Sequence, residues 1–125
     1  MIDHLSIGVR DIAKTRKFYD AALKPLGYTC VSAGETSLGY GKEKVSVWIL
    51  ASARPVSPDL ESGLHICFSA PTRKSVAAFH KAALAAGGSD NGGPGLRADY
   101  GDNYYAAFVL DPDGYRIEAY CSNET

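Results

Sequence analysis

The sequence has 125 residues with a net charge of −1 at pH 7, of which 46% are hydrophobic and 22% charged. This length and composition suit one soluble globular domain, and the balanced charge offers no basic surface for nucleic acid. No apolar run is long enough to span a membrane. Three cysteines without a CxxC pair, and no secretory signal, predict reduced thiols in a cytoplasmic protein.

The first half of the chain predicts one helix among several strands. Polar and apolar residues alternate over residues 3–9, which is typical of a half-buried strand. Asp11 can cap a helix over residues 12–23, which Pro25 and Gly27 end. Three further strands are expected at residues 28–32, 35–40 and 45–51, followed by a linker at residues 54–61 with two prolines.

The second half repeats this order. A strand is expected at residues 64–69, and Thr72 can cap a helix over residues 73–86. Residues 89–102 are rich in glycine and irregular, so they are expected to form a loop over a site. The chain then forms a hairpin over residues 104–121, around the turn Asp111-Pro112-Asp113-Gly114.

The turn fixes the register of this hairpin. Leu110 should lie opposite Arg116, and Phe108 opposite Glu118. One face then carries Tyr104, Ala106, Phe108, Leu110, Arg116, Glu118 and Tyr120. Because an ionised carboxylate is costly to bury alone, we expect Glu118 to meet a cation or hydrogen-bond donors.

The two halves are related as repeats. A shift of 61 residues takes His4 to His65, Phe18 to Phe79 and Gly27 to Gly88, and a shift of 70 takes Trp48 to Glu118. Each half reads β-α-β-β-β and is too small to hide both a helix and a sheet face. We therefore predict an α+β fold in which two βαβββ modules, residues 1–57 and 62–125, form a curved mixed sheet as one domain.

Equivalent positions in the two modules should face the same way. The alternation places His4, Trp48, His65 and Glu118 on the sheet faces that the helices leave open. Two imidazoles and one carboxylate with open positions are the arrangement that binds a catalytic divalent metal, and the indole of Trp48 cannot ligate. Taken singly, each residue is more often exposed and solvated, and Trp48 is as easily core as site lining.

The remaining polar side chains have other interpretations. Arg116 could bind a substrate anion or balance the charge of Glu118. We interpret His80 as structural or surface, and Cys67 and Cys121 as small core residues.

The chain resembles the vicinal-oxygen-chelate superfamily, which holds glyoxalase I, extradiol dioxygenases, fosfomycin-resistance thiol transferases and bleomycin-resistance proteins. The resemblance rests on His4-Leu5, Phe18-Tyr19, Leu26-Gly27, His65 and the run from Asp111 to Glu118. It implies paired βαβββ modules around a metal-binding cleft, with His4, His65 and Glu118 as metal ligands. Zn, Ni, Mn or Fe would be the ion, and paired modules in this family often come from two chains of a homodimer.

The sequence also departs from the patterns of these relatives at several positions. Glyoxalase I has a fourth ligand where this chain has Trp48, whereas fosfomycin-resistance enzymes similarly carry Trp there and often Thr at the position of Ser6. Their site Tyr appears here as Phe108, and their phosphonate-binding Lys has no match near Ala98. The expected function is a metal-dependent lyase, thiol transferase or dioxygenase with Glu118 as catalytic ligand, and with Ser6, Trp48, Tyr104, Phe108 and Arg116 binding a small-molecule substrate. The alternatives are a bleomycin-resistance-like protein that sequesters an aromatic ligand without catalysis, and a member that retains fold and metal but no catalysis.

Overall fold

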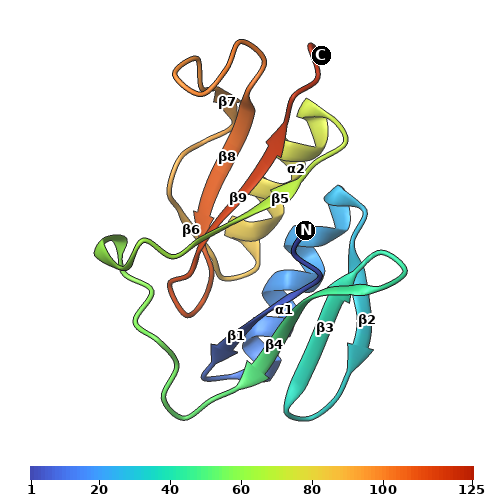
Figure 1. The fold of residues 1–125 in the computed structure, drawn as a ribbon, viewed down its shortest axis with the longest axis vertical. Coiled ribbons are helices and arrows are strands. Elements are labelled where there is room, and N and C mark those ends of the chain that lie inside the picture. Colours follow the sequence, from blue (N-terminus) through green and yellow to red (C-terminus); the bar gives the residue numbers. More distant parts are fainter.

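The computed structural model describes all 125 residues and shows two modules with the same topology (Figure 1). In the first, β1 (Leu5–Val9) leads into α1 (Ile12–Leu23) and a short 3-10 helix (Lys24–Leu26). The strands β2 (Thr29–Ala33), β3 (Ser37–Gly41) and β4 (Val45–Ala51) follow. The sheet order is β1-β4-β3-β2, in which β1 and β4 are parallel and the other pairs antiparallel.

The second module contains β5 (His65–Ser69), α2 (Arg73–Ala85), β6 (Ser89–Asp90), β7 (Gly95–Leu96), β8 (Tyr105–Leu110) and β9 (Arg116–Cys121). Its sheet runs β5-β9-β8-β6, with β7 also pairing with β8. The α+β fold with paired βαβββ modules is therefore confirmed. The two sheets are not hydrogen-bonded to each other within the chain. No helix is both long and apolar enough to cross a membrane.

Three expectations about local structure need correction. The first strand begins at Leu5, so His4 precedes it. The linker contains a 3-10 turn (Leu60–Ser62), because the Asp59 carboxylate accepts a hydrogen bond from the backbone N–H of Ser62. The glycine-rich segment is not wholly irregular, since β6 and β7 pair with β8 through backbone groups that need no hydrophobic alternation.

One hydrophobic core joins the modules. The helices α1 and α2 pack against each other, and 21 buried residues from both modules form a single cluster. The repeat-related Phe18 and Phe79 are both fully buried in it. The burial of Val47 and Ile49 on β4, and of Ile117 and Ala119 on β9, leaves the intervening Trp48 and Glu118 on the other side of each sheet.

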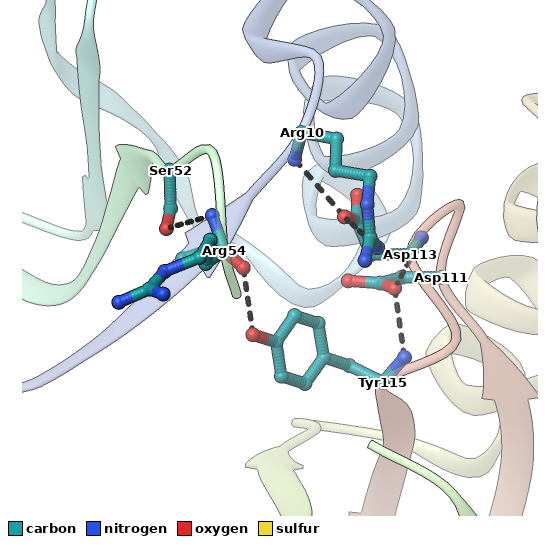
Figure 2. Close-up of polar contacts among 7 residues, drawn as sticks. Arg10, Ser52, Arg54, Asp111, Asp113 and Tyr115 are labelled. Carbon is teal, nitrogen blue, oxygen red and sulfur yellow. Dashed lines mark hydrogen bonds and ion pairs between the residues drawn. The ribbon is translucent and has the colours of Figure 1, made fainter. Parts of the chain in front are cut away.

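The Asp111–Gly114 turn fastens the second module to the first (Figure 2). Asp111 is 4% exposed and accepts a hydrogen bond from the Tyr19 hydroxyl of α1 at 2.6 Å. It also accepts hydrogen bonds from the backbone N–H groups of Asp113 and Tyr115, each at 2.9 Å (Figure 2). The Tyr115 hydroxyl donates to the Gly8 carbonyl at 2.6 Å, and the Arg10 backbone N–H donates to Asp113 at 3.0 Å. Burial raises the pKa of Asp111, although these hydrogen bonds oppose the shift. The motif that dominates the sequence is thus an intermodule contact.

Candidate functional site

Glu118 lies at the centre of the open face of the second sheet. It sits on β9, is 2% exposed, and receives two contacts from side chains. Its Oε1 lies 2.8 Å from His65 Nε2, and its Oε2 accepts a hydrogen bond from the Tyr104 hydroxyl at 2.6 Å. The expectation that Glu118 meets donors is confirmed, and neither donor is a lysine or arginine.

The strand register sets the surroundings of this carboxylate. Phe108 on β8 and Cys67 on β5 lie directly opposite Glu118 on its two neighbouring strands. The His65 ring stacks against Phe108 with centroids 6.2 Å apart. Cys121 is buried as expected, but Cys67 is exposed and is not the core residue that the sequence predicted. Desolvation by its neighbours, followed by the charge of Glu118, raises the pKa of Cys67 to about 12, so this thiol stays protonated and is a poor nucleophile.

Tyrosines extend the site on one side. The rings of Tyr104 and Tyr120 stack at 4.0 Å, and the exposed Tyr100 meets Tyr104 edge-on at 5.3 Å. Burial and the hydrogen bond to Glu118 both raise the pKa of Tyr104, so its hydroxyl remains a donor at neutral pH. Sequence alternation placed Tyr104 and Tyr120 on this face, whereas nothing in the sequence pattern indicated Tyr100.

Arg116 shares the face of Glu118 but does not balance its charge. Its Nε donates to the Leu64 carbonyl at 3.2 Å, and it makes no ion pair with Glu118. It lines a neighbouring cavity of about 700 Å³ between the linker and the β8–β9 hairpin, which includes Glu61 and Asn91 but neither His65 nor Glu118. A role in binding substrate anions therefore stays a prediction for Arg116.

The first-module residues form a second group. Trp48 on β4 is half-buried, pairs with Ser6 on β1 and contacts Gly39. Ser6 and His65 line one groove between β1 and β5. His4 is exposed, and its Nδ1 contacts the Asp3 carboxylate at 2.7 Å. It lines a different cavity of about 260 Å³, together with Cys67.

The three predicted ligands are not gathered within one chain. His65 and Glu118 are together, but no group of three His, Cys, Asp or Glu side chains is arranged to hold an ion. The second-module pair nevertheless fits two adjacent positions of a metal sphere. Two ligands about 2.1 Å from a common ion and about 90° apart lie about 3.0 Å from each other, close to the observed 2.8 Å.

Comparisons with known proteins identify the fold. The family model described as Glyoxalase/Bleomycin resistance protein/Dioxygenase superfamily matches residues 1–119. A glyoxalase/bleomycin resistance protein from Albidiferax ferrireducens T118 is 30% identical with a TM-score of 0.81, covering 94% of this chain and 95% of that one. A bleomycin resistance determinant encoded on the transposon Tn5 is 20% identical with a TM-score of 0.63, covering 96% and 95%.

A glyoxalase/bleomycin resistance protein/dioxygenase family enzyme from Burkholderia phytofirmans PsJN is 17% identical with a TM-score of 0.72, covering 98% of each chain. The search of curated proteins gave no match. The family model spans nearly the whole chain, and the paired βαβββ modules agree with it. The chain therefore belongs to the glyoxalase/bleomycin resistance protein/dioxygenase superfamily.

Proposed function

We propose that this protein is a metal-dependent enzyme that acts on a small molecule through adjacent oxygen atoms. The observation that carries the proposal is the Glu118 carboxylate, which is 2% exposed and lies 2.8 Å from His65 without a lysine or arginine partner. A buried carboxylate beside an imidazole costs folding free energy unless a cation or proton compensates it. Such costly groups concentrate at functional sites.

The donor set suits a divalent transition metal. Imidazole nitrogen and carboxylate oxygen atoms coordinate Zn, Ni, Mn or Fe ions. When bound, the ion would polarise substrate oxygens and stabilise developing negative charge. Glu118 and His65 would hold it, while the Tyr104 hydroxyl keeps Glu118 Oε2 occupied so that Oε1 faces the ion.

The third ligand would come from a second copy of the chain. His4 and Trp48 belong to the first module, and His65 and Glu118 to the second. The packing of α1 against α2 fixes the two modules relative to each other. A homodimer in which the first module of one chain faces the second module of the other would add His4 to the pair. Exposed apolar side chains on strands and loops, among them Leu50, Val56, Leu60 and Leu96, would be covered in such a dimer.

A bleomycin-resistance-like binding protein is the second candidate. The clustered rings of Tyr100, Tyr104 and Tyr120 favour it, because they offer a planar ligand an aromatic surface. In that case the site would bind its ligand without a metal, and substitution of Glu118 would change ligand affinity only slightly.

Metal content distinguishes the two candidates. The protein is purified without a histidine tag, analysed for bound metal, stripped, and titrated with Zn²⁺, Ni²⁺, Mn²⁺ and Fe²⁺. We expect Glu118→Gln and His65→Ala to weaken binding by about 100-fold or more, since each removes a ligand.

His80→Ala is the matched control, because the polar contact of its ring is with Asp90 at 2.9 Å, outside the site. Equal metal binding by all three variants, or none by the wild type, would contradict the proposal. A screen of diol, epoxide and thiol-adduct substrates on the metal-loaded protein would then define the reaction.

A further inference from the structure

The glycine-rich segment between β6 and β8 positions one arginine over the candidate site. The guanidinium of Arg97 lies over the Phe108 ring, with its carbon 5.2 Å from the ring centroid. The Phe108 ring also stacks with His65, with centroids 6.2 Å apart. Arg97 is therefore one aromatic ring away from the His65–Glu118 pair. We propose that Arg97 forms an anion-binding site that recognises a carboxylate or phosphate group of the substrate.

The segment is built to leave room for this guanidinium. A Cβ atom at Gly95 would lie 3.2 Å from Arg97 Nη1, and one at Gly92 would lie 3.4 Å from Arg97 Nη2 and 3.1 Å from Phe108. Gly92 also has a φ of +141°, which other residues rarely adopt. A side chain at Gly95 would push the guanidinium aside by a few tenths of an ångström, and one at Gly92 would crowd the Phe108 ring beneath it. The glycines thus have a role that the sequence pattern alone did not reveal.

Backbone hydrogen bonds hold the segment on β8. The Phe108 N–H donates to the Gly92 carbonyl at 2.8 Å, and the Arg97 N–H donates to the Tyr104 carbonyl at 2.7 Å. The side chain of Arg97 is fixed as well, because its Nη2 donates to the Gly93 carbonyl at 2.6 Å. A guanidinium held in one position loses little conformational entropy when it binds an anion.

The guanidinium retains unused donors. Of its five N–H groups, only this one to Gly93 has a protein acceptor, and no carboxylate lies within ion-pair distance. By contrast, Arg10 and Arg16 each have an aspartate partner. A half-buried guanidinium without a counter-charge attracts oxyanions, and its planar fork matches carboxylate and phosphate oxygens.

The position of Arg97 specifies a class of substrate. The substrate would carry adjacent oxygens that lie at His65 and Glu118, together with an anionic group that extends past Phe108 to Arg97. As a statement about substrate, the inference rests on the proposed function. The anion site itself can be tested without the metal.

The test uses nuclear magnetic resonance of the metal-free, full-length protein. Inorganic phosphate and, separately, acetate are added, and the backbone amide signals of Gly92, Gly93, Gly95 and Arg97 are followed. We expect at least one of the two anions to cause saturable shifts at these amides. Arg97→Gln should weaken that binding about 10-fold or more, and Arg97→Lys should weaken it less, because the charge remains but the planar fork is lost.

Arg54→Gln is the matched control, since Arg54 is exposed in the linker and its side chain makes no ion pair. It should leave the shifts unchanged. A response to phosphate or to acetate identifies the class of anion. No saturable response to either, or a response that persists in Arg97→Gln with unaltered affinity, would overturn the inference.

Metal titration of the same variants separates this inference from the proposed function. If Arg97→Gln binds metal normally but loses the anion response, the anion site is supported. If metal binding depends on Glu118 while no anion responds, the Arg97 site is refuted alone. If the anions respond through Arg97 but no metal binds, the anion site stands and the metal-dependent function fails.

Discussion

Replacement of Tyr19 by phenylalanine removes one oxygen from the contact between the modules. The Tyr19 ring is 1% exposed, and its hydroxyl donates to Asp111 Oδ2 at 2.6 Å. The two backbone N–H groups donate to the other oxygen, Oδ1, so the Tyr19 hydroxyl is the only hydrogen-bond donor to Oδ2. Because the phenyl ring fills nearly the same volume, the change isolates the hydrogen bond.

The size of the expected loss of stability depends on the acceptor that each tyrosine leaves without its hydrogen bond. Leaving a buried acceptor without its partner costs about 1–3 kcal/mol, and the upper part of that range applies to a charged group. We therefore expect Tyr19→Phe to lower the free energy of unfolding by about 2–3 kcal/mol. Tyr115→Phe removes a donor to the neutral Gly8 carbonyl, so its cost should be nearer 1 kcal/mol. Tyr40→Phe should cost least, because its partner Asp20 is about half exposed.

Urea unfolding of the three variants, monitored by circular dichroism, gives these differences directly. The account is supported if the loss of unfolding free energy is largest for Tyr19→Phe, smaller for Tyr115→Phe and smallest for Tyr40→Phe, at an unchanged m-value. A loss below about 0.5 kcal/mol for Tyr19→Phe would refute the reasoning, since the Asp111 carboxylate would then be adequately solvated without its tyrosine.

Three further predictions concern other parts of the molecule. Because burial raises the folded-state pKa of Asp111 above its ordinary value of 3.8, the stability it contributes is greatest below that value and is lost as pH rises through the higher folded pKa. The difference in unfolding free energy between wild type and Asp111→Asn should change in that pH window and be flat well above it. Gly114→Ala should cost about 1–2 kcal/mol in the same assay, because φ at Gly114 is +95°. Trp48→Glu should add a fourth ligand and so tighten metal binding, which competition with a chelator measures. The same change should impair activity. Unchanged metal affinity in this variant would place Trp48 outside the site.

Much of the fold is predictable because its signals are local. Asp11 and Thr72 cap helices that begin where expected, and the register that places Phe108 opposite Glu118 follows from the Asp111–Gly114 turn. Period-two alternation also places Trp48 and Glu118 on the open sheet faces. These features depend on residues close together in the sequence.

The parts that the sequence did not reveal depend on packing between distant segments. Nothing local indicates that Tyr19 reaches Asp111, 92 residues away, or that Arg97 lies over Phe108. Symmetry between the repeats places His4 and His65 in equivalent positions, but it does not say which two modules face each other. That choice depends on how α1 packs against α2, which no periodicity in either helix encodes.

Mixed dimers test most directly whether two chains share the metal site. His4→Ala and Glu118→Gln chains carrying different non-histidine tags are co-expressed, and the dimers that contain one of each are isolated and analysed for metal. In a shared site, one of the two sites in the mixed dimer combines both substitutions, and the other has all three ligands intact. We predict about one metal ion per mixed dimer, and none in the homodimer of either variant. A mixed dimer without metal, or full metal binding by the His4→Ala homodimer, would contradict the shared site.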